Sequence, residues 1–351
     1  MLSVLRAVAR FFRETIGWSR IGVMLSLGII AVAVVVLFHT LRHTNVNEVI
    51  AALKATEKHQ IIFALLFVVI GYVSLTFYDL FALRTVGFDK IPYRIAALTG
   101  FTSYSVGHNV GASAFSGGAV RYRIYSAHGL TGVDVAKICF VAGLTFWLGN
   151  AAMLGLGVLY VPGAASALDQ LPLWANRIVA GVILAVLFSY IGWVSSGVRI
   201  IGKGGWQVRL PGGASTLLQM CIGILDLSCC AAAMYMLLPD EPNIGFAYMA
   251  VIFVTATMLG FASHAPGGLG VFDAAMLVAL WQYDKEDLLA GLLLFRLLYY
   301  ILPFVVALAI LGVREMLLSI RGQKTIAEPE KIEVTAPIRS AIEIIKKTDA
   351  G

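Results

Sequence analysis

Residues 260–273 read GFASHAPGGLGVFD, and residues 107–123 read GHNVGASAFSGGAVRYR. Each stretch places a histidine a few residues ahead of a Gly-Gly pair, and each interrupts a region that is otherwise apolar. Because glycine is a weak helix former, a glycine-rich stretch in such a region indicates a break between helices. We therefore predict that regions 93–130 and 245–282 each form two shorter helices that meet at the break.

The composition of the whole chain is that of a membrane protein. Hydrophobic residues make up 59% of it and charged residues 13%, whereas soluble domains average about 45–50% apolar and 25% charged residues. Apolar runs close to the roughly 20 residues that cross a bilayer recur along the chain. The predicted fold is an all-α, polytopic bundle of membrane helices. About six full spans are expected, at residues 21–41, 60–83, 135–160, 177–195, 214–238 and 288–313.

The Lys and Arg residues orient these spans, because positive charge is retained on the cytoplasmic side of a membrane. With both termini in the cytoplasm, the two broken regions become re-entrant hairpins that enter the membrane from opposite faces, which makes an inverted repeat. The basic 42–59 loop is the exception, since it would lie outside. The connections expected in the cytoplasm are 84–94, 121–123, 199–209 and 314–324, and those expected outside, which lack Lys and Arg, are 161–176 and 239–245.

Three segments follow from this topology. Residues 1–20 are a basic cytoplasmic N-terminus, and the apolar run after them has no small-residue cleavage site, which indicates a retained signal anchor. Residues 21–313 form a single transmembrane domain. Residues 314–351 form a charged cytoplasmic tail that is too short to be a catalytic domain. The net charge of +6 fits basic cytoplasmic loops and gives no reason to expect nucleic acid as a partner.

The two breaks have a functional and a structural interpretation. Backbone N–H and C=O groups freed at membrane depth cost several kcal/mol each in lipid, so a broken helix must lie inside protein or beside a watery cavity. The N-termini of the half-helices would then direct N–H groups and a positive dipole end at an anion, such as a lipid phosphate. In the alternative interpretation, the glycines only permit close helix packing.

Ionisable residues inside apolar segments add to the functional interpretation, because a charge near the bilayer centre costs at least about 2.5–3.5 kcal/mol. Asp79 and Asp226 are such intramembrane charges, at similar distances ahead of the two Gly-Gly pairs. Arg296 lies inside the last span, where Asp273 is its expected partner. Arg121 and Arg123 suit a phosphate through their forked donors, or they are ordinary arginines of a cytoplasmic loop.

The candidate site gathers the residues of both breaks and the charges near them. His108 and His264 lack ligand spacing, so hydrogen bonding is expected of them and no metal site is predicted. No nucleophile elbow, Walker or Rossmann pattern occurs in a plausible context, and no cofactor is expected. The residues predicted to bind or translocate a substrate are His108, Asn109, Ser116, Gly117, Gly118, Arg121, Arg123, His264, Pro266, Gly267, Gly268, Asp273 and Arg296.

Four segments resemble the membrane region of the lysylphosphatidylglycerol synthases, also called multiple peptide resistance factors. The resemblance covers roughly residues 20–315 and extends to membrane proteins that consist of this region alone. The segments that carry it are SGGAVRYRIY at 116–125, HGL at 128–130, PGGLGVFD at 266–273 and FRLLYYILP at 295–303.

The resemblance implies a function in lipid transport. In that family the membrane region moves aminoacylated phospholipid between leaflets, while a separate cytosolic domain transfers lysine. Because that domain is missing from this sequence, the resemblance implies a non-enzymatic phospholipid translocase (flippase) in the bacterial inner membrane. Its partners would be membrane phospholipids. The family's glycines, Arg121, Arg123, Asp273 and Arg296 match position by position.

Two other functions stay open. The chain would be a secondary transporter of a small anionic solute, or the membrane partner of a separately encoded lipid-modifying enzyme. The headgroup, the direction of transport, the energy source and the oligomeric state, including a homo-oligomer, do not follow from the sequence.

Overall fold

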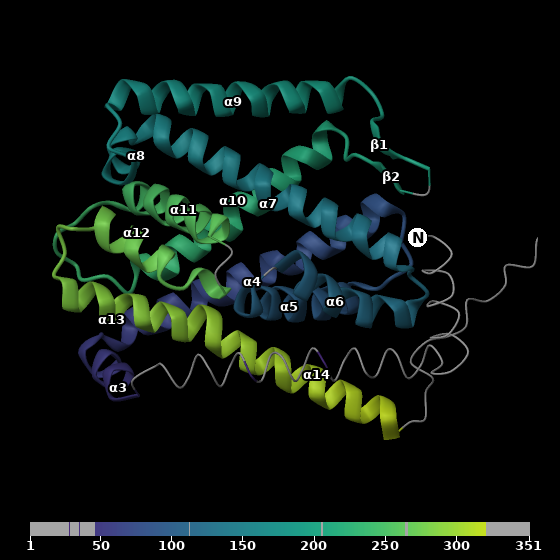
Figure 1. Cartoon of the computed structure of the whole chain (residues 1–351), viewed down its shortest axis with the longest axis horizontal. Helices are drawn as coiled ribbons and strands as arrows, with labels where there is room; N and C mark the ends of the chain where they lie inside the picture. The colour runs from purple at the N-terminus through teal and green to yellow at the C-terminus, as the bar shows by residue number, and fades with distance from the viewer. Residues whose placement is uncertain are drawn as a thin grey trace, which may run out of the picture.

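The computed structural model is mostly helical, and it describes residues 28, 35, 46–111, 113–204, 206–263 and 266–320 (Figure 1). The helices run from α3 to α14, with three short helical segments named η and one strand pair. Their bounds are α3 Val46–Ala55, α4 Lys58–Val86, α5 Tyr93–Val110, α6 Ser113–Tyr125, η1 Ser126–His128, α7 Gly132–Tyr160, α8 Pro162–Asp169, α9 Leu173–Ser195, β1 Ile200–Lys203, β2 Trp206–Arg209, α10 Gly213–Tyr235, α11 Phe246–Ala262, η2 Pro266–Gly268, α12 Val271–Ala279, α13 Lys285–Phe295, η3 Arg296–Ile301 and α14 Leu302–Ile320.

Within the residues that the structure describes, five helical stretches are long and apolar enough to cross a membrane, and they match five of the predicted spans. The protein is thus a helical membrane protein. The first predicted span, 21–41, lies outside the described residues except for Gly28 and Val35. The five stretches run along the long axis of the molecule, with α9 at one edge (Figure 1), and they are Lys58–Val86, Gly132–Tyr160, Leu173–Ser195, Gly213–Tyr235 and Lys285–Leu318.

Three connections differ from the prediction of plain loops in an all-α chain. Strands β1 and β2 pair antiparallel, with Ile200 opposite Arg209, because Gly202 and Gly204 adopt the positive φ angles of 96° and 60° that a tight reversal needs. Helix α3 lies within the 42–59 connection, and α8 begins at Pro162 within the 161–176 connection. Proline suits the first turn of a helix because a backbone N–H group there has no hydrogen-bond acceptor within the helix, so its absence costs no hydrogen bond.

The first broken region is an antiparallel hairpin of α5 and α6. The chain reverses after α5 at Gly111, whose φ of 80° lies in the left-handed region. The prediction of a break at the Gly-Gly pair is wrong here, since Gly117 and Gly118 lie inside α6. A Cβ atom on Gly117 would lie 2.9 Å from the carbonyl oxygen of Ser103 on α5. Gly117 therefore permits close packing of α5 and α6, as the structural interpretation of the glycines predicted.

The second broken region is also an antiparallel hairpin, formed by α11 and α12 around η2. Here the Gly-Gly pair does lie at the break: Gly267, Gly268 and Gly270 have φ angles of 59°, 64° and 81°. A Cβ atom on Gly260 of α11 would lie 3.4 Å from the Cα of Gly268. Because three of the four residues in this turn have positive φ angles, glycine suits these positions better than any residue with a Cβ atom.

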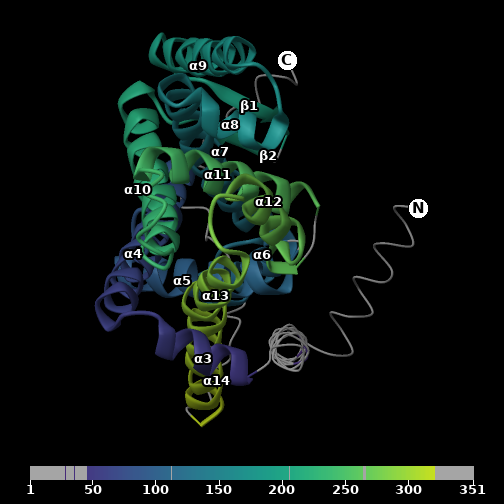
Figure 2. The ribbon, with the colours of Figure 1, turned by 90° about the vertical axis from the view of Figure 1, so that its left-hand side faces the viewer.

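The tips of the two hairpins meet inside the bundle. The α5–α6 and α11–α12 hairpins occupy opposite halves of the long axis (Figure 1), and Figure 2 shows α12 and α6 on the side of the bundle opposite α10 and α4. Helix α5 contacts η2, and a Cβ atom on Gly267 would lie 3.7 Å from the carbonyl oxygen of His108. The two tips thus pack against each other, while Leu269 and Gly270 of the second turn remain exposed.

Helices α7 and α10 cross at a contact between two glycines. A Cβ atom on Gly149 would lie 2.6 Å from the Cα of Gly223, and one on Gly223 would lie 2.8 Å from the Cα of Gly149. Both obstructing atoms are backbone and cannot rotate away. Small residues that let two backbones approach are a common basis of helix association in membranes.

The variant Gly149→Ala should therefore destabilise the folded protein in detergent by about 1–3 kcal/mol, the usual cost of overpacking. Gly143→Ala in the same helix is the matched control, because nothing lies within 4 Å of its added Cβ. Replacing that helical glycine should be neutral or stabilising by about 0.5–1 kcal/mol. Thermal unfolding of purified protein measures both, and equal melting temperatures of the two variants would contradict the close crossing.

Candidate functional site

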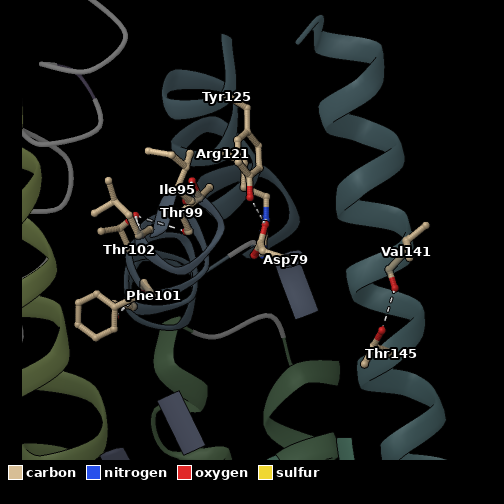
Figure 3. A network of polar contacts seen from close by, with 11 residues as sticks. Asp79, Ile95, Thr99, Phe101, Thr102, Arg121, Tyr125, Val141 and Thr145 are labelled. Atoms are coloured by element: carbon tan, nitrogen blue, oxygen red, sulfur yellow. Dashed lines mark hydrogen bonds and ion pairs between the residues drawn. The ribbon is translucent and has the colours of Figure 1, made fainter. Parts of the chain in front are cut away.

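A buried ion pair joins the first hairpin to α4 (Figure 3). Arg121 of α6 donates from Nε to Asp79 Oδ1 at 2.9 Å and from Nη2 to Asp79 Oδ2 at 2.8 Å, a forked contact. The hydroxyl of Tyr125, one turn further along α6, donates to Asp79 Oδ1 at 3.1 Å. The guanidinium carbon of Arg121 also lies 4.7 Å from the centre of the Tyr104 ring. Asp79 is fully buried and Arg121 nearly so.

This pair changes what the sequence predicted for Arg121. The forked donors of Arg121, which were expected to hold a phosphate, are occupied by Asp79. The sequence indicated Asp79 as a charge inside the membrane but did not indicate its partner. A forked, charge-assisted contact is among the stronger hydrogen bonds of proteins. In this conformation Arg121 anchors the first hairpin, and an anion would reach it only in exchange for Asp79.

The meeting point of the two hairpin tips is polar and aromatic. Asn109 Nδ2 donates to the carbonyl oxygens of Ser105 at 2.8 Å and Tyr300 at 3.1 Å, so it ties α5 to the last membrane helix. The ring of His108 stacks on Tyr299 at 6.1 Å between centres. His108 Nδ1 is buried, and no residue in the described part of the chain forms a hydrogen bond with it. A buried nitrogen of this kind is the polar atom that a water or ligand at the hairpin tips would satisfy.

The last membrane helix carries a π-helical turn, η3, beside these tips. Pro303 follows it and has no N–H to donate to the carbonyl four residues earlier, that of Tyr299. That carbonyl instead accepts a hydrogen bond of 3.0 Å from the hydroxyl of Tyr72 on α4. The irregular turn thus exposes backbone acceptors inside the bundle, and π-turns occur frequently at functional sites.

The second hairpin has its own ion pair. Arg296, the first residue of η3, donates from Nε to Asp273 Oδ1 at 3.0 Å and from Nη2 to Asp273 Oδ2. The predicted pairing of these residues is confirmed. Asp273 also accepts a hydrogen bond of 3.0 Å from the backbone N–H of Gly270 at the start of α12. Both side chains are partly exposed, at 22% for Asp273 and 16% for Arg296, so this pair is more accessible than Arg121–Asp79.

Arg123 lies in a third charged cluster, near the end of the bundle where α14 ends. Its Nη2 donates to Glu315 Oε2 at 2.5 Å, and Arg314 Nη1 donates to Glu315 Oε1 at 3.1 Å. The cluster therefore holds two cations and one anion. Arg123 Nε and Nη1 are buried and have no hydrogen-bond partner among the described residues. An open apolar cavity of about 490 Å³ lies beside Arg314, lined by Leu98, Ala309, Ile310, Val313, Leu317 and Leu318.

Asp226 lies in α10 against α4, apart from the three ion pairs. It is 3% exposed, and the hydroxyl of Tyr78 donates to its Oδ2 at 3.1 Å. Asp79 and Asp226 were predicted to be equivalent in two repeats, but their partners differ: Asp79 binds the first hairpin, whereas Asp226 binds α4. The adjacent residues Tyr78 and Asp79 thus belong to two different polar clusters. Tyr78 donates to Asp226, whereas Asp79 pairs with Arg121.

The other predicted residues take less prominent places. Ser116 Oγ donates to the carbonyl of Gly111 at 2.9 Å and supports the turn between α5 and α6. A Cβ atom on Gly118 would lie 3.6 Å from Cys139 Sγ. Pro266 begins η2, while His264 lies outside the described residues. Within the described ranges, no three His, Cys, Asp or Glu side chains gather as metal ligands do.

The sequence did not single out the aromatic residues that connect these clusters. The ring of Tyr104 lies 5.8 Å from the rings of both Tyr78 and His108, which links the α4 carboxylates to the hairpin tips. Glu315 was missed as well. A tyrosine in an apolar span brings a hydroxyl that needs a partner when buried, and that signal would have found Tyr78 and Tyr125.

No protein-family profile matches the chain, but individual relatives do. It is 28% identical over 278 residues to an uncharacterized protein of Synechocystis sp., covering 79% of this chain and 86% of that protein. It is 29% identical over 248 residues to the inner membrane protein YbhN of Escherichia coli, covering 69% and 76%. A phosphatidylglycerol lysyltransferase of Staphylococcus haemolyticus is 24% identical over 294 residues, covering 78% of this chain and 32% of the enzyme.

These matches are consistent with a stand-alone membrane region similar to part of the phosphatidylglycerol lysyltransferases. Two lysyltransferases match it over 78% and 81% of its length. The match covers only about a third of each enzyme, at 32% and 33%. The transfer activity of those proteins is therefore not carried over to this membrane region.

The Arg121–Asp79 pair gives a stability prediction. Asp79→Asn removes the charge that neutralises Arg121 in the bundle, and breaking a buried pair in this way should cost about 3–5 kcal/mol of unfolding free energy. The double variant Asp79→Leu/Arg121→Met removes both charges and should recover most of that loss. Thermal unfolding in detergent measures each variant.

The exposed pair of Arg84 and Asp89 provides the control, with side chains 43% and 72% exposed. Asp89→Asn should change the unfolding free energy by less than about 1 kcal/mol, because solvent screens such pairs. A double variant at 79 and 121 that is no more stable than Asp79→Asn would contradict the pairing.

Proposed function

We propose that this protein is a phospholipid translocase of the bacterial inner membrane, which moves a phosphate-bearing headgroup between leaflets while the acyl chains remain in the bilayer. Membrane phospholipids, anionic or aminoacylated, are its proposed partners. The single observation that carries the proposal is the cluster of Arg123, Glu315 and Arg314: Arg314 lines an open apolar cavity, and Arg123 Nε and Nη1 are buried without a hydrogen-bond partner among the described residues. The inner-membrane location of YbhN supports the location.

The Arg123 cluster has the chemistry of a phospholipid site. Glu315 neutralises one of the two arginines, so the cluster carries one excess positive charge. Buried donors without partners cost about 1–3 kcal/mol each, and more when charged, so phosphate oxygens that accept from Arg123 would be favoured. The adjacent cavity between α5 and α14 is lined by leucine, isoleucine, valine and alanine side chains. An acyl chain would occupy it without loss of hydrogen bonds.

The proposed topology has six full spans, including 21–41, and two re-entrant hairpins in an inverted repeat. Helix lengths support it: α12 has nine residues and α6 has 13. At about 1.5 Å per residue, neither length reaches across a hydrocarbon core of about 30 Å. Two hairpins that begin at opposite ends of the bundle and meet at their tips would alternately open a path on each side.

The charges at the two ends of the bundle support cytoplasmic termini. Lys90 and Arg94 flank the start of α5, and Arg199, Lys203 and Arg209 surround the strand pair, at the same end of the long axis (Figure 1). The opposite end carries Asp169 at the end of α8, and Asp240 and Glu241 in the connection after α10. This asymmetry is the one that the positive-inside rule describes.

The test is lipid transfer in vesicles that contain fluorescent phosphatidylglycerol, followed by quenching of the outer leaflet with a membrane-impermeant reductant. Arg123→Gln should slow transfer by at least about tenfold, since a hydrogen bond to a charged group is worth about 1.5–3 kcal/mol. Arg209→Gln is the control, because Arg209 is an exposed residue of β2 and its replacement should leave the rate unchanged.

Equal transfer rates for wild type and Arg123→Gln, in protein of equal thermal stability, would overturn the assignment of this site. Absence of lipid transfer in the wild type, together with uptake of a small anion, would favour the solute-transporter function. Activity that appears only with a co-purified enzyme would favour the partner function.

A further inference from the structure

We propose that Asp226 binds a proton and that its protonation and release couple a transmembrane proton gradient to lipid movement. The inference deepens the translocase proposal and rests on it, since it supplies an energy source for the same bundle. It depends on a contrast between the two buried carboxyl groups of the α4–α10 region, Asp79 and Asp226.

The surroundings of Asp226 offer little to an ionised carboxylate. Tyr78 provides the one hydrogen bond of ordinary length, at 3.1 Å. Ser74 Oγ lies 3.5 Å from Asp226 Oδ1 but donates its single hydrogen to the carbonyl of Gly71 at 2.7 Å. Cys230 Sγ is 3.9 Å away and is a weak donor. An ionised carboxylate has about four acceptor positions, and most of those on Asp226 would remain empty.

Asp79 is the internal comparison. It is as deeply buried, yet it accepts hydrogen bonds from both Arg121 Nε and Nη2 and from Tyr125. Its negative charge is thus matched by a guanidinium, whereas the charge of Asp226 is matched by none. A buried carboxyl group without a cation favours its neutral, protonated form.

The titratable groups around Asp226 come from several elements, and none of them is a cation that pairs with it. Asp226 forms no ion pair with any Lys, Arg or His of the described residues. The charged residues of the neighbouring helices α7, α9 and α13 are Asp134, Lys137, Arg177, Lys285, Glu286 and Asp287, and α11 has none. The facing titratable groups are Tyr72 and Tyr78 of α4, Tyr104 of α5, Tyr299 of η3, and Cys229 and Cys230 of α10 itself.

Position allows Asp226 to respond to the hairpins. Its donor Tyr78 lies 5.8 Å from Tyr104, whose ring lies 5.8 Å from His108 at the tip of α5. A movement of the first hairpin would therefore shift the ring against which Tyr78 packs. When a proton arrives, one O–H bond forms on the Asp226 carboxylate; when water reaches the group from the other side, that bond breaks and the proton leaves. No other bond changes.

The first experiment reads the proton directly and needs no lipid movement. Infrared difference spectra of the purified full chain should contain the carbonyl band of a protonated carboxyl group at neutral pH, and Asp226→Asn should remove it. Asp89→Asn, which alters an exposed carboxylate, should leave the band in place. Persistence of the band in Asp226→Asn, or its absence from the wild type, would overturn the proton site.

The second experiment measures coupling in phosphatidylglycerol vesicles. With one proton per lipid, a gradient of one pH unit should shift the steady-state distribution of fluorescent lipid by up to about tenfold, since one pH unit is a tenfold ratio of proton activity. Asp226→Asn keeps the size and the acceptor for Tyr78, and it should abolish the shift while lipid still equilibrates.

The outcomes separate the two proposals. A shift that persists in Asp226→Asn, or that follows a sodium gradient instead of the pH gradient, would overturn coupling through Asp226 and leave the translocase proposal intact. A wild type that moves no lipid would overturn the translocase function. In that case the infrared band alone would establish whether Asp226 holds a proton.

Discussion

Irregular backbone inside a membrane protein must be covered by protein, because lipid offers no hydrogen bonds. Two hairpin turns here contain the irregular backbone, at Gly111 and at Gly267 to Gly270, and each turn faces the other across the contact between His108 and Gly267. Helices α4, α7 and α10 pack against the helices of the two hairpins, and α7 and α10 cross at a contact between two glycines. Leu269 and Gly270 of the second turn remain exposed.

The charged residues around that centre differ in burial and in their partners. Arg121 and Asp79 are buried and fix the first hairpin to α4, whereas Arg296 and Asp273 are partly exposed and fix the second hairpin to the last helix. Arg123 is buried too, and its contact with Glu315 joins the first hairpin to α14. Among the described residues, two of the Arg123 nitrogens have no acceptor, which sets this arginine apart from Arg121.

Much of the fold was predictable because membrane spans are long and strongly apolar. Five spans, two hairpins and the Asp273–Arg296 pair follow from hydropathy, glycine and charge. The position of the first turn did not, because Gly117-Gly118 and Gly267-Gly268 look alike in sequence although only the second pair has left-handed backbone. Whether a glycine breaks a helix or packs inside one depends on the neighbouring helix, here on Ser103. The partner of Arg121 was equally hidden, because Asp79 is distant in sequence and lies near its own span's end.

The hydrogen bond between Tyr72 and the last membrane helix is made to a backbone carbonyl, that of Tyr299. Every amino acid presents this carbonyl, so the side chain at 299 is free to change without loss of the bond. Position 303 acts on the same oxygen from a distance, because proline there has no N–H group to donate to it. Any other residue would bring a second donor to the oxygen that Tyr72 uses, and the two lone pairs of that carbonyl would then be shared between α4 and the last helix itself.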